Sequence, residues 1–208
     1  MTLRVILVLR KFGVILLLIT AIACGGGNPG NKHSPLSGDV SSGGSFGSMG
    51  VDFETRVPKE HGVPADLLAE ARAATFQVVG LGCKEAQFGT AFLVADRTLV
   101  TNAHVVAGVR APRIIVRGRK LLARIISFDP ATDLAVLMVD EDVSKPLSLA
   151  EATPDAVVAL LGYDSSGLLI ARPARVDQLI MAIGKDIYGE ETEGRRVLII
   201  DAWIDAGF

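Results

Sequence analysis

The sequence predicts an all-β protein with two β-barrels, the first complete and the second incomplete. Short apolar runs of strand length fill the chain from residue 76 onward, and turn signals such as Gly118-Arg119 and Asp129-Pro130 recur between them. This spacing is typical of sandwiches and barrels rather than of alternating strands and helices. A more polar connector over 143–154 divides the runs into two blocks. Because a barrel needs all its strands to remove its edges, the shorter second block predicts only part of a barrel.

A short helix is expected before the strands. Pro64 suits the first turn of a helix, and Asp66 interacts favourably with the positive end of the helix dipole. The strands expected in the first block are 76–81, 88–94, 99–101, 113–117, 121–128 and 134–139, and those in the second are 156–162, 168–172, 174–182 and 196–200.

The first 23 residues are predicted to be a signal peptide. Arg4, Arg10 and Lys11 give a positive start, and the apolar run that follows is shorter than the roughly 20 residues that span a bilayer. Two cleavage sites compete: a signal peptidase site ending at Ala23, or a bacterial lipobox in which Cys24 is lipidated. We favour the lipoprotein because this single early cysteine lies at the cut. Either site predicts an exported protein, in the periplasm or on the cell surface, with a possible lipid anchor to the membrane.

The chain is expected to divide into four parts. After the signal peptide (1–23), a Gly- and Ser-rich tether (24–60) has too few apolar residues to bury a core. The short helix and the first barrel occupy 61–150, and the partial second barrel occupies 151–208. If Cys24 is lipidated, Cys83 has no partner in the chain, so it is either buried or paired with a residue further downstream.

Composition argues against several classes of function. The net charge is −2 and only 5% of residues are aromatic, so neither a basic field nor a stacking platform for nucleic acid is expected. Three histidines and two cysteines show no ligand spacing for a metal, and the glycine motifs of nucleotide sites are incomplete. We therefore expect no metal, no cofactor and no nucleic-acid partner.

One histidine and one aspartate are the candidate catalytic residues. His104 directly follows the expected strand at 99–101, and Asp133 lies between a turn and the expected strand at 134–139. A carboxylate half-buried at a strand start needs a donor, and an imidazole N–H is suitable. Near the other end of the chain, Gly207 can adopt the backbone geometry that an oxyanion-binding N–H requires.

The chain resembles a trypsin-like serine protease of the chymotrypsin fold, closest to the bacterial HtrA/Deg and periplasmic membrane-anchored types. The resemblance rests on 89–94 (Gly-Thr-Ala-Phe-Leu-Val), 100–106 (Val-Thr-Asn-Ala-His-Val-Val), 129–137 (Asp-Pro-Ala-Thr-Asp-Leu-Ala-Val-Leu) and 201–207 (Asp-Ala-Trp-Ile-Asp-Ala-Gly). It implies a serine endopeptidase that acts on polypeptides. His104 would be the general base and acid, Asp133 would orient it, and Gly207 would be an oxyanion donor.

Two further expectations follow from the resemblance. Residues that line the substrate pocket partly precede the serine, so Trp203 and Ile204 hint at a pocket for an apolar side chain. The expected serine would come directly after Phe208, so the chain is interpreted as a fragment that is inactive as it stands. The alternatives are a non-catalytic pseudoprotease or binding module, and an unrelated envelope β-protein in which His104 and Asp133 lie far apart.

This expectation is tested by translating the codons that follow Phe208. We expect a Ser-Gly-Gly-like sequence, because the register of 201–207 places the nucleophile next. Any other start would contradict the interpretation as a fragment.

Overall fold

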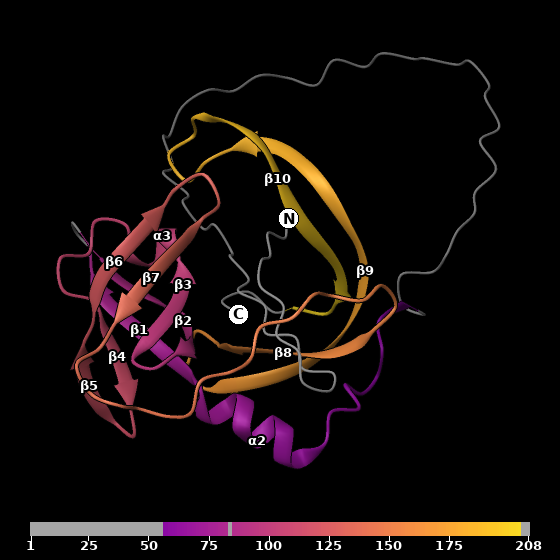
Figure 1. Cartoon of the computed structure of the whole chain (residues 1–208), viewed down its shortest axis with the longest axis horizontal. Coiled ribbons are helices and arrows are strands. Elements are labelled where there is room, and N and C mark those ends of the chain that lie inside the picture. Colours follow the sequence, from indigo (N-terminus) through magenta and orange to yellow (C-terminus); the bar gives the residue numbers. More distant parts are fainter. Residues whose placement is uncertain (1–55, 83–84, 205–208) are drawn as a thin grey trace, which may run out of the picture.

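The computed structural model describes residues 56–82 and 85–204. The predicted signal peptide, most of the predicted tether, Cys24, Cys83 and Gly207 lie outside the described residues. Figure 1 shows two groups of strands with a helix below them.

The first group is a curled antiparallel sheet in the order β5-β4-β1-β2-β3-β7-β6. Strands β3 and β7 lie side by side in it and lead into the site. Their burial alternates, so that Leu99 and Thr101 face the same core as their partners Leu137 and Ala135. The seven strands are β1 (Thr75–Leu81), β2 (Ala86–Ala95), β3 (Thr98–Asn102), β4 (Arg113–Val116), β5 (Arg119–Leu122), β6 (Arg124–Asp129) and β7 (Leu134–Met138).

The second group is a three-stranded antiparallel sheet with β9 (Leu169–Lys185) between β8 (Val157–Tyr163) and β10 (Glu191–Ala202). Helix α2 (Ala65–Ala73) lies below both sheets in Figure 1. A cluster of buried side chains from α2, β2 and β8 joins the two sheets: Ala71, Phe92, Ala159 and Leu161. The predicted all-β class is confirmed. Among the described residues the second sheet has only three strands, so the second barrel is incomplete.

Two strand predictions were wrong. The expected strand at 121–128 is two strands, because β5 pairs with β4 whereas β6 pairs with β7. The expected break at Pro173 is absent, and β9 runs through it. Proline lacks an N–H and is tolerated where a strand side is unpaired. Pro173 pairs with Ala159 of β8, while the pairing with β10 stops one residue away at Ala174.

None of the helices in the described part of the chain is long and apolar enough to cross a membrane.

Gly89 in β2 permits close packing of the short helix α3 (Ala103–Val106). A Cβ built on Gly89 would lie 2.6 Å from both γ carbons of Val105. Val105 is buried at 7% exposure and is the neighbour of His104. The absence of a side chain at Gly89 therefore sets how closely the His104 segment approaches the sheet.

We expect Gly89→Ala to destabilise the fold by about 1–3 kcal/mol, because it overpacks this contact. Chemical denaturation measures the change. Gly194→Ala is the matched control, since its Cβ would come closest to the terminal methyl of the flexible Met181 side chain, at 3.3 Å, and would lie at ordinary contact distances from Ile183 and Ala182. In the Gly89→Ala background, Val105→Ala should cost less than it does alone. Simple addition of the two costs would contradict the contact.

Candidate active site

Strand register brings the two predicted site residues together. In the antiparallel pair β3–β7, Asn102 lies opposite Leu134. His104 lies in α3, two residues after Asn102, and Asp133 immediately precedes Leu134. The chain therefore turns away from both strands at the same end of the sheet, with the imidazole and the carboxylate on adjoining segments.

The side chains of His104 and Asp133 are in direct contact. His104 Nδ1 lies 3.0 Å from Asp133 Oδ1 and 2.9 Å from Oδ2. The backbone N–H of His104 also donates to Oδ1, at 3.0 Å. The carboxylate is nearly buried, with a side-chain exposure of 8%, while the imidazole is 32% exposed. One partner is thus removed from water and the other reaches solvent.

Asp133 is held in an unusual backbone conformation. Its φ is +59°, in the left-handed region that few residues other than glycine adopt and that aspartate tolerates better than most. The backbone N–H of Ala103 donates to the Asp133 carbonyl at 3.1 Å. The Asn102 amide donates to the same carbonyl at 3.2 Å and to Oδ2 at 3.3 Å. Three consecutive residues of the β3–α3 segment therefore fix both the backbone and the carboxylate of Asp133.

The turn before Asp133 is stabilised by Asp129. Its carboxylate accepts hydrogen bonds from Ala131 N–H at 3.0 Å, from Thr132 N–H at 3.3 Å and from the Thr132 hydroxyl at 2.6 Å. The hydroxyl bond is the main cause that lowers the pKa of Asp129. Because this pKa is lower in the folded state, the turn gains stability above the carboxyl's unfolded pKa. That stability is lost as the pH falls through the folded pKa.

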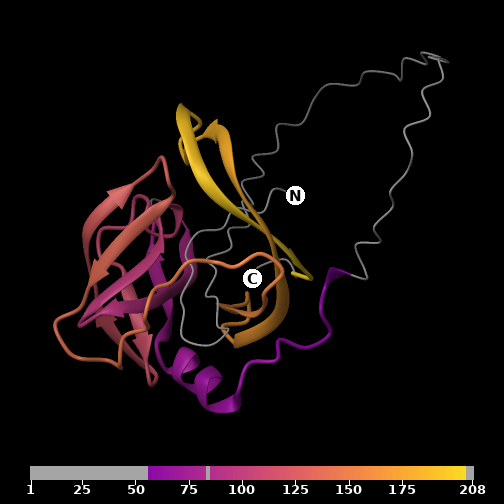
Figure 2. The ribbon, with the colours of Figure 1, turned by 45° about the vertical axis from the view of Figure 1, so that its right-hand side comes forward.

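The β9–β10 hairpin contacts this turn from the other sheet. The Arg195 guanidinium donates to the carbonyl of Ala131, and Ile187 N–H donates to the carbonyl of Pro130 at 3.4 Å. The hairpin end reaches the β6–β7 turn in both Figure 1 and Figure 2. The Asp133 turn is therefore contacted by both sheets.

The contact determines which chemistry the imidazole can perform. A carboxylate can only accept at neutral pH, so His104 Nδ1 carries the proton in this pair and Nε2 is left as the basic nitrogen. Asp133 also stabilises the imidazolium that forms when Nε2 takes a proton. This arrangement suits general base catalysis, provided that a hydroxyl is placed against Nε2.

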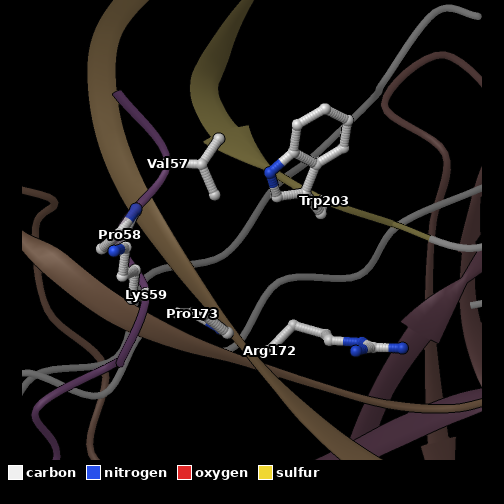
Figure 3. Close-up of a pocket in the computed structure, with 6 residues that line it drawn as sticks. All are labelled: Val57, Pro58, Lys59, Arg172, Pro173 and Trp203. Carbon is white, nitrogen blue, oxygen red and sulfur yellow. The ribbon is translucent and has the colours of Figure 1, made fainter. Parts of the chain in front are cut away.

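Trp203 and Ile204, the two residues predicted to line a substrate pocket, lie in different environments from each other. Trp203 is 57% exposed and lines a pocket of about 540 Å³ with Arg172, Pro173 and residues 57–59 (Figure 3). Ile204 packs against the core of the second sheet and is not among the residues that line this pocket. Gly207 lies outside the described residues. Within the described ranges, no group of three or more His, Cys, Asp or Glu side chains could hold a metal ion.

Sequence reasoning missed Asn102 and Asp129. Asn102 is a buried polar residue, at 7% exposure, that ends a strand directly before the histidine segment. An amide at such a position needs a buried partner, and this was the available signal. Asp129-Pro130 is predicted as a turn and as part of the family motif, but with no bonding role for the Asp129 carboxylate, although an aspartate that begins a turn often bonds backbone N–H groups further along.

Comparison with known proteins identifies the family. A model of the trypsin-like peptidase domain matches residues 89–208, more than half of the chain. The chain belongs to this family. The match includes both His104 and Asp133, and the predicted resemblance to chymotrypsin-like serine proteases is confirmed.

The curated relatives of this trypsin-like peptidase domain are longer proteins. Serine protease Rv3671c of Mycobacterium tuberculosis (strain H37Rv) is 36% identical over 128 residues, which make up 60% of this chain and 32% of that protein. A probable periplasmic serine endoprotease, DegP-like, of Halomonas elongata is 41% identical over 68 residues, or 31% of this chain and 14% of that protein. The chain thus spans about a third or less of the length of these relatives.

Solved structures have the same fold. The active form of the Rv3671c protease matches with a TM-score of 0.64 at 28% identity, covering 84% of this chain and 75% of that chain. The HtrA-type protease AlgW with a tripeptide matches with a TM-score of 0.52 at 24% identity, covering 62% of this chain and 44% of that chain. At 24% identity, the match to AlgW shows similarity of fold alone.

Asp133→Asn should change the tautomer of His104. The backbone N–H of His104 donates to Oδ1 of Asp133, and the Asn102 amide donates to Oδ2. In either orientation, the NH2 group of an asparagine would therefore face another donor. We expect neutral His104 to carry its proton on Nδ1 in the wild type and mainly on Nε2 in the variant. Long-range imidazole ¹⁵N NMR distinguishes the two. Asp129→Asn is the control and should leave the tautomer unchanged. The same tautomer in the wild type and in Asp133→Asn would contradict the contact.

Proposed function

We propose that this trypsin-like peptidase domain is part of a serine endopeptidase that cleaves polypeptides by a His-Asp-Ser triad. His104 acts as general base and then general acid, and Asp133 holds its tautomer and orientation. The observation that carries the proposal is the contact of the His104 imidazole with both carboxylate oxygens of Asp133, at 2.9 and 3.0 Å.

The burial of this pair supports a catalytic role over a purely structural one. The Asp133 side chain is nearly buried and accepts a hydrogen bond from the backbone N–H of His104. The carboxylate is thereby held in a position that orients the His104 ring. The ring itself remains 32% exposed, so a substrate and a nucleophile can reach it. A histidine that served only to satisfy a buried carboxylate would gain nothing from this exposure.

The nucleophile in this proposal is a serine at the position after Phe208. The register of 201–207 with the family motif supports this position. The backbone N–H of Gly207 and that of the serine would stabilise the oxyanion of the tetrahedral intermediate. Without this serine the triad would have no nucleophile.

The proposed substrates are polypeptides with an apolar side chain next to the cleaved bond. Trp203 lines an open pocket with Lys59, Arg172 and three residues whose apolar side chains suit such a group: Val57, Pro58 and Pro173. Ile204 would support the pocket from the core behind it. AlgW, an HtrA-type protease of the same fold, has solved structures with a tripeptide and with a decapeptide.

The proposed location is the bacterial cell envelope. The predicted signal peptide and the predicted lipidation of Cys24 are the basis for proposing export and a membrane anchor. The relative from Halomonas elongata is described as periplasmic. The domain boundaries 1–23, 24–60, 61–150 and 151–208 belong to the same proposal.

The proposal predicts that His104→Ala abolishes serine reactivity in the polypeptide encoded by the complete gene. Labelling by a fluorophosphonate should be lost and kcat for peptide cleavage should fall by roughly 10⁶, because the serine loses its general base. His33→Ala is the matched control: His33 lies in the predicted tether, outside the matched peptidase domain, and activity should persist.

The alternative is a pseudoprotease or binding module. It predicts a folded, exported product of the complete gene that takes up no fluorophosphonate, whichever residue stands at position 104. That result would overturn the peptidase.

A further inference from the structure

Residues 56–63, here called the N-terminal strap, run along the second sheet before α2 begins. Their path borders β9 and β10 in Figure 1 and Figure 2, far in sequence from both strands. Val57 of the strap is buried at 8% exposure. The strap is therefore packed onto the sheet, and its residue Arg56 makes the charged contacts.

Arg56 lies between two carboxylates of neighbouring strands. Its Nη2 donates to Asp177 Oδ1 of β9 at 2.5 Å, and its Nε lies 2.8 Å from Asp201 Oδ2 of β10. Arg175 of β9 holds the strap from the other direction, since its Nε donates to the carbonyl of Arg56 at 3.1 Å. The hydrogen bond to Asp177 and the charge of Asp201 raise the pKa of Arg56, so the guanidinium keeps its charge.

Asp201 is the member of this group that needs a cation. Its side chain is only 9% exposed, whereas that of Asp177 is 28% exposed. Its Oδ2 is buried and accepts no well-aligned hydrogen bond within the described residues. A buried carboxylate without a compensating charge is costly. Arg175 lies opposite Asp201 in the β9–β10 register, but its hydrogen bonds go to the carbonyls of Arg56 and Asp155.

Asp201 is also close to the proposed substrate pocket. Two residues after it, Trp203 lines the pocket, while Val57, Pro58 and Lys59 of the strap line another side (Figure 3). The ion pair thus joins the two segments that line the pocket. Arg56 directly precedes Val57 of the strap, and Asp201 lies two residues before Trp203.

We propose that Arg56 is a positioning residue: by neutralising buried Asp201 it fixes the 201–204 segment and seats the N-terminal strap as a wall of the substrate pocket. The structural part of this inference concerns the 208-residue chain itself. Its consequence for catalysis rests on the proposed function.

Trp203 is the single tryptophan of the chain, so its fluorescence reports on the pocket directly. In Arg56→Gln the acrylamide quenching constant should rise about 1.5- to 2-fold as the strap loosens, since the indole is now 57% exposed. The unfolding equilibrium constant should rise about tenfold, because a buried carboxylate loses its cation. Arg56→Lys keeps the charge and should remain close to the wild type.

Two further variants test the pairing itself. Asp177→Asn is the matched control, because it removes the more exposed partner and leaves Asp201 paired; its quenching should equal that of the wild type. Adding Asp201→Asn to Arg56→Gln should return the unfolding constant to within about threefold of Asp201→Asn alone, because no uncompensated charge remains. The proposal would be overturned if the effects of Arg56→Gln and Asp201→Asn on the unfolding equilibrium constant simply multiplied in the double variant. It would also be overturned if acrylamide quenching in Arg56→Gln were unchanged.

The catalytic consequence is measured in the polypeptide encoded by the complete gene. Arg56→Gln should lower kcat/KM about tenfold for peptides with a large apolar side chain at the cleavage site, mainly through KM. Labelling by a small fluorophosphonate, which does not fill the pocket, should be retained. Equal losses for large and small side chains would contradict a role in the pocket. Absence of labelling in the wild type would overturn the peptidase, but the fluorescence result on Arg56 would stand.

Discussion

The site depends on one carboxylate that the fold removes from water. Burying a carboxylate to 8% exposure is costly without hydrogen-bond donors, and the β3–α3 segment supplies them to Asp133 from Asn102 and His104. The same bonds hold its backbone at a positive φ. Burial, backbone conformation and the orientation of the imidazole are therefore one constraint: a change that releases the carboxylate also releases the ring.

The two sheets contribute to this constraint differently. The first sheet supplies the register that places Asn102 opposite Leu134, and Gly89 allows α3 to pack closely on β2. The second sheet supports the Asp133 turn through Ile187 and Arg195 of its hairpin. It also carries the segment at 201–204 toward the pocket. The candidate site is thus assembled from strand ends and turns held by packed sheets, an arrangement common among enzymes.

Much of this could be predicted from the sequence, since strand patterns and turn signals are local. The all-β class, the two groups of strands and the His104–Asp133 pair could all be inferred. The continuity of β9 could not, because whether Pro173 breaks a strand depends on where its neighbour β10 stops pairing. The division between β5 and β6 depends likewise on the choice of partner strands.

The supporting residues of the site were the hardest to predict. Asn102 and Asp129 have partners that are visible only once the turns are folded, and the partners of Arg56 lie more than a hundred residues away. Long-range ion pairs leave no periodic signal in a sequence. The residues proposed to perform the chemistry were therefore easier to recognise than those that hold them in place.

A crystal structure of the 208-residue chain tests the central claim most directly. It should show His104 Nδ1 within hydrogen-bond distance of the Asp133 carboxylate, with Asp133 at positive φ and bonded to the Asn102 amide. A structure in which the imidazole and the carboxylate point into separate surroundings would contradict the claim, and only an all-β trypsin-like peptidase domain without a recognised site would remain.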